Sequence, residues 1–514
     1  MRRTTNAAGS ARQWLAAAVA VIAAGAVAGC AVGPDFHRPA PPSVDSYTSE
    51  PLDSTVSTPG HGGAAQRFVT GDQIQADWWR LFHSTQLNGL IKNALAQNPS
   101  LQAAQARLEQ AQANLDVVQG GLYPQLDVGV SATRQKFSGA QFGGGLGGAT
   151  IFNLYGASLN ASYDLDVFGG TRRSIEAQAA QVDFQSYELR ATYLTLLGNV
   201  VGTAINAASF KAQFNATQAI LEAEQRQLNL VEDQEQAGAV PRSDVLQARA
   251  QLAASRTRLA PLRQQLAQAQ HQLAILTGTF PGNWNPVDLV LEDLSLPQTL
   301  PLVVPSQLVR RRPDILAAEA ALHAASANVG VATANLYPHI SLSGSYGSQA
   351  TDAGDLFNAG NTIWNIGVSL LQPLFHGGAL HAQKRAAVAA YKEALANYRQ
   401  TVLTAFGQVA DVLRALETDA ASLKAQQIAL DSAQKSLDLA QVQYRAGAAS
   451  FLTVLTAIQQ YQQSQLGYVQ ALAQRYQDTA RLFNALGGGW WNRDALPPAA
   501  QPDNPVQLQN SEEQ

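Results

Sequence analysis

Apolar and polar residues alternate in four short stretches of the chain. These stretches are residues 126–133, 155–165, 340–345 and 364–370. Because successive side chains of a strand point to opposite faces, each stretch predicts a β-strand with one apolar face and one face of small or polar residues. The four strands fall into two pairs, so the pattern predicts two β-hairpins, over residues 122–166 and 336–374.

Helical periodicity fills the chain after each hairpin. Residues 171–233 and 379–445 contain no proline, and their apolar residues recur at steps of three, four or seven. This spacing is typical of coiled coils, and at 1.5 Å per residue each segment would extend roughly 100 Å as a helix. An Ala-Gly-Ala turn follows each long helix, so we expect helical hairpins over residues 171–277 and 379–487, the first kinked at Pro261.

The same landmarks occur twice, in the same order. They are Leu-Tyr-Pro at residues 122 and 336, Phe-Gly-Gly at 168 against Phe-His-Gly-Gly at 375, and Ala-Gly-Ala at 237 and 446. The first pair is offset by 336 − 122 = 214 residues and the last by 446 − 237 = 209 residues. This near-constant spacing predicts a tandem duplication. We expect repeats over residues 76–300 and 301–490, a connector closing the first repeat, and a C-terminal tail over residues 491–514.

The N-terminal residues have the features of an export signal. Three arginines precede an alanine-rich apolar run over residues 14–27, which is too short for a membrane span. The run ends in Val27-Ala28-Gly29-Cys30, which resembles a bacterial lipobox, so residues 1–29 are expected to be removed and Cys30 to carry lipid. An ordinary signal cut beside small residues is the alternative. Ala31 indicates outer-membrane delivery in such lipoproteins, and residues 30–75 are expected to form a flexible tether.

Composition excludes several classes of protein. Only 14% of the residues are charged, against roughly 25% in an average soluble protein. The net charge of −4 excludes the basic excess of a nucleic-acid-binding protein, and 46% hydrophobic residues exclude a disordered chain. Beyond residue 30 no run of about 18 apolar residues occurs, so membrane-spanning helices are not expected. The single cysteine excludes an intramolecular disulfide and a cysteine zinc site.

The two-faced hairpins suit a membrane β-barrel, with lipid outside and water inside. A soluble sheet packed on a core is the alternative, and the export signal favours the membrane. Four strands in separate pairs cannot close a barrel, and open strand edges are not viable in lipid, so three chains would have to contribute 3 × 4 = 12 strands. The helices would then associate into a coiled-coil tube. The expected fold class is therefore mostly α with a membrane β-barrel.

Three stretches of the sequence carry a resemblance to a known family. They are Ala76-Asp77-Trp78-Trp79-Arg80, Val309-Arg310-Arg311-Arg312-Pro313-Asp314-Ile315 with Glu319, and Leu336-Tyr337-Pro338. They resemble the outer-membrane efflux lipoproteins, which are the TolC/OprM-like exit channels of tripartite efflux pumps. The resemblance implies a homotrimer with a twelve-stranded barrel, a long periplasmic α-barrel and a mixed collar. It also implies two partners, a periplasmic adaptor protein and an inner-membrane pump of the proton-driven RND type.

The resemblance also implies a gate at the periplasmic end. In the family, a tyrosine on the second-half turn and an aspartate on the first-half turn help to hold neighbouring coiled coils shut, and the matching residues are Tyr444 and Asp244. The family often carries two acids after the second turn that select cations. Thr453 and Thr456 stand there instead, which indicates a less negative field. The alternative is that Asp244 only stabilises the start of a helix.

The sequence contains no motif that supports catalysis or a cofactor. Residues 143–148 fit G-x-G-x-x-G, but a strand-like run follows them, so an exposed hairpin loop is expected. His376 and His381 lack acidic or cysteine neighbours that would complete a metal site. The arginines at 310–312 are expected to form a solvated collar patch or a helix entry.

We therefore predict a passive outer-membrane efflux duct with a large periplasmic portion, and no enzyme. Drugs or other small molecules would pass through it from the pump and adaptor to the exterior. Three alternatives stay open: an exit channel for type I protein secretion, a channel for metal ions, and a non-transporting periplasmic scaffold lipoprotein.

Overall fold

The structure is a computed structural model that describes residues 31–50, 52–71, 74–137 and 150–492. Cys30 and the glycine run at 143–148 lie outside these residues. The described chain divides into two compact units, each formed by three separate stretches. The first unit contains residues 31–39, 108–185 and 318–398, and the second contains 40–107, 186–317 and 399–492. Two long helices, α4 (Gly170–Gln236) and α9 (Ala379–Arg445), have residues in both units.

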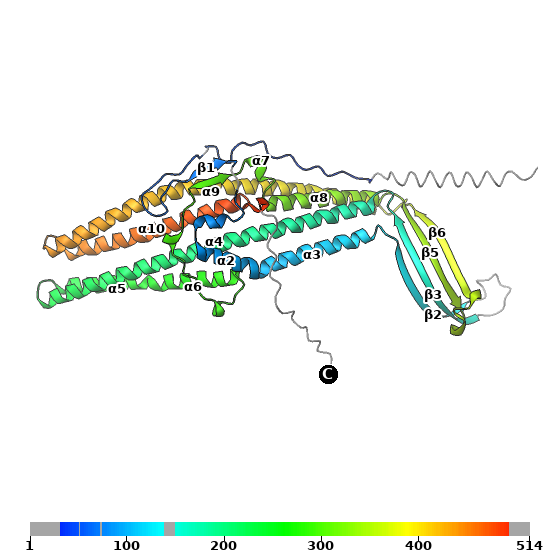
Figure 1. The fold of residues 1–514 in the computed structure, drawn as a ribbon, viewed down its shortest axis with the longest axis horizontal. Helices are drawn as coiled ribbons and strands as arrows, with labels where there is room; N and C mark the ends of the chain where they lie inside the picture. The colour runs from blue at the N-terminus through cyan, green and yellow to red at the C-terminus, as the bar shows by residue number, and fades with distance from the viewer. Residues whose placement is uncertain (1–30, 51, 72–73, 138–149, 493–514) are drawn as a thin grey trace, which may run out of the picture. The chain divides into compact units, whose positions relative to one another are not determined.

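The first unit contains a four-stranded antiparallel sheet in the order β2-β3-β5-β6 (Figure 1). Its strands are β2 (Gln125–Phe137), β3 (Thr150–Leu165), β5 (His339–Ala350) and β6 (Thr362–Leu371). The alternating stretches of the sequence therefore form strands, as their period of two predicts. Val128 and Val130 of β2 and Ile366 and Val368 of β6 are exposed. The sheet thus presents apolar side chains that the described chain leaves uncovered.

Helix α8 (Pro313–Ala334) is the one described helix that is long and apolar enough to cross a membrane. Its most apolar stretch is 56% buried within the protein. In the first unit, Glu319 pairs with Arg38 at 2.5 Å, while His323 contacts Glu176 at 2.9 Å and stacks on Phe36. These contacts indicate that α8 packs against other parts of the protein.

The second unit contains the returning helices and a small parallel sheet. Its elements include α2 (Thr85–Gln97), the start of α3 (Pro99–Gly120), α5 (Arg242–Thr257), α6 (Leu259–Leu276), α7 (Pro305–Leu308), α10 (Phe451–Ala485), β1 (Arg67–Thr70) and β4 (Thr299–Leu302). Strands β1 and β4 pair in parallel, and Pro301 makes β4 hard to recognise in the sequence because proline is unfavourable in strands. In the core, Trp78 stacks on Phe483 with 5.2 Å between ring centroids.

The first returning helix is interrupted near the predicted kink, although Arg258, between the two parts, keeps right-handed helical backbone angles. Helix α5 ends at Thr257 and α6 begins at Leu259, so the break lies at Arg258, three residues before Pro261. A proline ring clashes with the carbonyl four residues earlier, which here belongs to Thr257. The predicted distortion is therefore present, but it is displaced towards the N-terminus by the reach of the proline ring.

The described part of the predicted tether, which spans residues 30–75, contacts the rest of the protein and is not a free linker. In the first unit, the N–H of Val32 bonds to the carbonyl of Phe168, and Asp35 pairs with Arg173 at 2.7 Å. In the second unit, residues 55–66 supply four oxygen acceptors to the buried guanidinium of Arg475. A charge taken out of water requires such partners, and this requirement holds the segment in place.

Candidate functional site

The two long helices end in matching turns. Helix α4 is followed by Ala-Gly-Ala at residue 237 and α9 by the same sequence at residue 446, and Gly238 and Gly447 have φ of 71° and 72°. In each turn the second alanine donates its N–H to a carbonyl five residues earlier, at 2.8 Å. Glycine adopts this left-handed conformation without a Cβ clash. The Ala-Gly-Ala motif therefore determines where each helix turns back.

Tyr444 lies in the last turn of α9 and contacts two other helices. Its hydroxyl donates a hydrogen bond to Oε1 of Gln234 in α4 at 3.0 Å, and its ring packs against Phe451 of α10 at 5.6 Å between centroids. Burial raises the pKa of the Tyr444 hydroxyl, and the carboxylate of Asp244 raises it further. The hydroxyl therefore stays protonated at neutral pH and acts as a donor.

Asp244 lies in the first turn of α5 and is half-buried. It is close enough to Tyr444 to act on the hydroxyl through its charge, whereas the hydrogen bond of Tyr444 goes to Gln234. A carboxylate in this turn also interacts favourably with the helix dipole. Gln234, Asp244 and Tyr444, which we call the turn cluster, thus lie together within one chain.

Thr453 and Thr456 lie in the first turns of α10 and are exposed. The Thr453 hydroxyl is 3.1 Å from that of Ser450, and the Thr456 hydroxyl donates to the carbonyl of Leu452 at 3.0 Å. Both side chains are neutral, and each is satisfied within its own helix or cap. At this position the chain therefore presents hydroxyl groups and no carboxylate.

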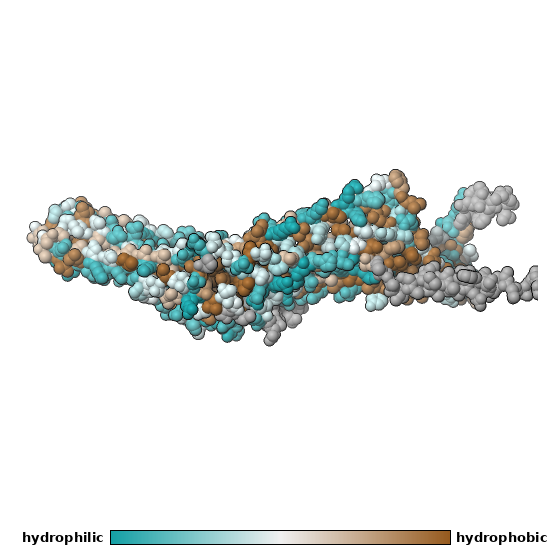
Figure 2. All heavy atoms as spheres, turned by 90° about the horizontal axis from the view of Figure 1, so that it is seen from above, coloured by the Kyte–Doolittle hydropathy of each residue, from teal (hydrophilic) through white to brown (hydrophobic). Residues whose placement is uncertain are grey.

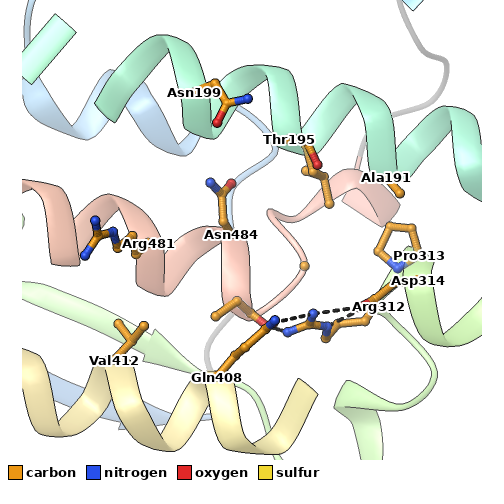
Figure 3. Close-up of a pocket in the computed structure, with 13 residues that line it drawn as sticks. Ala191, Thr195, Asn199, Arg312, Pro313, Asp314, Gln408, Val412, Arg481 and Asn484 are labelled. Atoms are coloured by element: carbon orange, nitrogen blue, oxygen red, sulfur yellow. Dashed lines mark hydrogen bonds and ion pairs between the residues drawn. The ribbon is translucent and has the colours of Figure 1, made fainter. Parts of the chain in front are cut away.

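A cavity of about 460 Å³ opens in the second unit beside Arg312 (Figure 3). The guanidinium of Arg312 donates to both carboxylate oxygens of Asp314, at 3.0 and 2.7 Å, to Gln408 at 2.7 Å and to the carbonyl of Ala485 at 2.8 Å. Arg312 is only 7% exposed. The expectation of a solvated arginine patch is therefore wrong for Arg312, whose donors are all directed into the protein. Asp314 does lie at the entry of α8, as predicted.

A family model described as outer membrane efflux protein matches residues 90–279 and 304–488. The chain belongs to this family. The matched residues cover both predicted repeats and include the turn cluster and the Arg312 region. The resemblance inferred from the short motifs is thereby confirmed.

Individual relatives agree with this assignment to the outer membrane efflux protein family. The chain is 34% identical over 448 residues to the pyoverdine export outer membrane protein OpmQ of Pseudomonas aeruginosa, covering 86% of this chain and 94% of the relative. It is 31% identical over 464 residues to the cation efflux system protein CusC of Escherichia coli, covering 90% and 97%. The solved outer-membrane channel OprN superposes with a TM-score of 0.80 at 29% identity, covering 90% of this chain and all of OprN.

Membership of the outer membrane efflux protein family confirms the predicted function and location. The protein is an outer-membrane efflux channel with a large periplasmic part and a mostly helical, TolC-like fold. Channels of this family are homotrimers that work with a periplasmic adaptor and an inner-membrane pump of the RND type. The partners predicted from the sequence are therefore the partners of the family.

Proposed function

We propose that three copies of this chain form one exit duct, in which each copy contributes four strands to a twelve-stranded outer-membrane barrel and the long helices enclose a periplasmic conduit. The observation that carries the proposal is the open sheet of the first unit. Among the described residues, β2 pairs only with β3 and β6 pairs only with β5. Unpaired strand edges are costly in lipid, and closing the sheet with further copies removes them.

The two faces of the sheet support the same proposal. Val128 and Val130 of β2 and Ile366 and Val368 of β6 carry exposed apolar side chains, as lipid-facing positions require. Gly129, Ser131, Gly367 and Ser369, which alternate with them, are small and suit a water-filled lumen. The chain then acts by conduction and not by catalysis, and a lipid on Cys30 would add a second attachment to the membrane.

The cargo of the duct is proposed to be small organic molecules. The names of the relatives include export of pyoverdine and efflux of cations, so the same channel architecture serves different cargoes in different proteins. Thr453 and Thr456 place neutral hydroxyls at the predicted cation-selective ring, which disfavours a channel specialised for cations. The adaptor and the pump would select the cargo before it reaches the duct.

Deleting the gene for this chain is expected to raise the intracellular accumulation of dyes and antibiotics and to lower their inhibitory concentrations. Metal tolerance and protein secretion should be unchanged, because the cargo is proposed to be small and organic. Dye accumulation, inhibitory concentrations and secreted protein are measured in parallel, and the strain is complemented with the intact gene. Normal drug accumulation with lost protein secretion would instead assign the chain to type I secretion.

The turn cluster is proposed to hold the periplasmic end of the duct closed. Replacing Tyr444 with Phe and Asp244 with Ala removes one hydrogen bond and one charge, worth about 1 kcal/mol together, and is expected to increase the open population roughly fivefold. The readout is single-channel conductance, and Tyr461→Phe, which removes the hydroxyl of another half-buried tyrosine in α10, is the matched control. Equal conductance of the double variant, the control and the unaltered protein would contradict this gate.

A further inference from the structure

The first strand–helix junction of the chain is closed by a pair of aromatic rings. Phe168 lies three residues after the end of β3, Tyr337 lies two residues before the start of β5, and their rings stack with 4.8 Å between centroids at an interplanar angle of 19°. Strands β3 and β5 are neighbours, with Leu165 opposite Ile340 in the register. The stack therefore marks the point where one strand leaves the sheet and the adjacent strand enters it.

The duplication provides a second pair of the same rings. The counterpart of Tyr337 is Tyr123, because 337 − 214 = 123, and the counterpart of Phe168 is Phe375 in the matching Phe-x-Gly-Gly motif, an offset of 375 − 168 = 207. Tyr123 precedes β2 and Phe375 follows β6, and these strands are the two edges of the sheet. Tyr123 is 69% exposed and Phe375 is 87% exposed. The chain thus carries the elements of a second stack whose two halves are both uncovered.

We infer that Phe375 of one copy stacks on Tyr123 of the next copy, which repeats between chains the contact that Phe168 and Tyr337 make within one chain. This inference rests on the proposed trimeric barrel and assigns its closing contact. The surface around Phe375 would then be covered by a second copy of this chain. A groove of about 370 Å³ beside Phe375, lined in part by Leu336, Leu374 and His381, offers space for an incoming ring.

The same transfer determines the strand register between copies. Within the chain, Tyr163 of β3 lies opposite Leu342 of β5, and Ala161 lies opposite Gly344. The two hairpins fix the equivalence of the strands, because Val128 pairs with Leu159 in the first and Leu342 with Val368 in the second. Strand β5 therefore matches β2 at 342 − 128 = 214 residues, and β6 matches β3 at 368 − 159 = 209 residues. Moving the Ala161–Gly344 pair by these offsets places Leu370 opposite Val130. Both residues are exposed and apolar, with Val130 at 78% and Leu370 at 65%. A slip by one residue would place Val130 opposite a residue on the other face of β6.

Figure 2 shows hydrophobic residues exposed at the surface among hydrophilic ones. Leu374 and Phe375, which follow β6, are among the most exposed large apolar side chains in the described chain, at 92% and 87%. A Cβ atom added to Gly377 or Gly378 would have no neighbour within 4 Å. A Cβ atom added to Gly169 in the first junction would instead meet Ala31. The second junction is therefore open where the first is filled, as expected if another copy supplies the missing contact.

Cysteine cross-linking tests the register directly. Directly opposed antiparallel residues have Cα atoms about 4.5–5.5 Å apart, within the range of a disulfide. Val130→Cys with Leu370→Cys is expected to give covalent dimer and trimer bands on non-reducing gels of outer membranes. Val130→Cys with Ile366→Cys, four residues or about 13 Å along the strand, should give none. Each single variant controls for Cys30, the one native cysteine.

Side-chain truncation tests the stack. Phe375→Ala is expected to reduce the fraction of detergent-resistant trimer several-fold at a fixed temperature, and Tyr123→Ala to do the same. The double variant should retain the same trimer fraction as the less stable single variant, because both substitutions remove the same contact. Phe357→Ala, in the loop between β5 and β6 and exposed at 84%, is the matched control and should leave the trimer fraction unchanged.

The outcomes separate failure of this contact from failure of the proposed channel. Amine cross-linking that yields only monomers in membranes would overturn both the barrel and the contact. Amine-linked trimers combined with a disulfide at the shifted register, or with no disulfide at either register, would overturn the contact alone. Equal trimer fractions for Phe375→Ala and Phe357→Ala would also overturn it.

Discussion

Replacing Arg475 with methionine is expected to destabilise the second unit by about 3–5 kcal/mol, because four buried acceptors lose their donor at once. Arg475 is fully buried in α10. Its guanidinium donates to the carbonyls of Gly62 and Ala64 at 3.0 and 2.8 Å, to the Thr55 hydroxyl at 3.1 Å and to Oε1 of Gln66 at 3.4 Å. Methionine preserves most of the volume, so the loss reflects the missing donors and charge.

A pair of acidic side chains increases this effect. Asp419 of α9 lies beside Asp478 of α10, and burial together with the hydrogen bond to Asp478 and its charge raises the pKa of Asp419 to about 7. The positive charge of Arg475 opposes that rise. Burial in turn lowers the pKa of Arg475. Without the guanidinium the pKa of Asp419 rises further. We therefore expect the stability of the Arg475→Met variant to fall as the pH rises from the ordinary carboxyl range through 7, because the unfolded chain releases this proton more readily than the folded one.

Arg481→Met is the matched control for Arg475→Met. Arg481 pairs with Asp478 at 2.7 Å but its side chain is 60% exposed, so its loss should cost at most about 1 kcal/mol. Thermal unfolding of the detergent-solubilised protein and limited proteolysis within residues 55–66 are the measurements. Only Arg475→Met should expose this segment to protease. Equal cleavage of both variants would contradict the role assigned to Arg475.

The Arg475 network also shows why part of the fold was not predictable from the sequence. The four strands and the long helices follow from local periodicity, because alternation at residues 126–133 and heptad spacing after residue 379 act within single elements. The contact of Arg475 with Gly62 joins residues 413 positions apart, and no local pattern encodes it. The glycine- and proline-rich composition of residues 31–65 indicates flexibility until a distant partner is known.

The turn cluster shows the same limit on a smaller scale. Tyr444 and Asp244 could be assigned from their positions beside the two Ala-Gly-Ala turns in a sequence resembling efflux channels. Gln234 could not, because it is one of many glutamines in alanine- and glutamine-rich helices. Only the structure shows that its Oε1 accepts the hydrogen bond of Tyr444. The burial of Arg312 was also not predictable, because nothing in a run of three arginines shows which of them is buried.

The protein as a whole is expected to conduct ions once it is assembled in a membrane. Three copies that close the sheet would bury the strand edges, direct residues such as Val130 and Val368 towards lipid, and line the lumen with small side chains such as Ser131. Neutral Thr453 and Thr456 at the proposed gate should leave only weak preference for cations. A scaffold lipoprotein with the same helices would have no continuous water-filled path.

Single-channel recording of the purified full-length protein in a planar lipid bilayer therefore tests the central claim most directly. The account predicts discrete, uniform current steps from trimers, with a reversal potential near zero in a salt gradient. Protein that is trimeric and inserted in the bilayer, yet gives no current steps before or after removal of the Tyr444 hydroxyl, would contradict it.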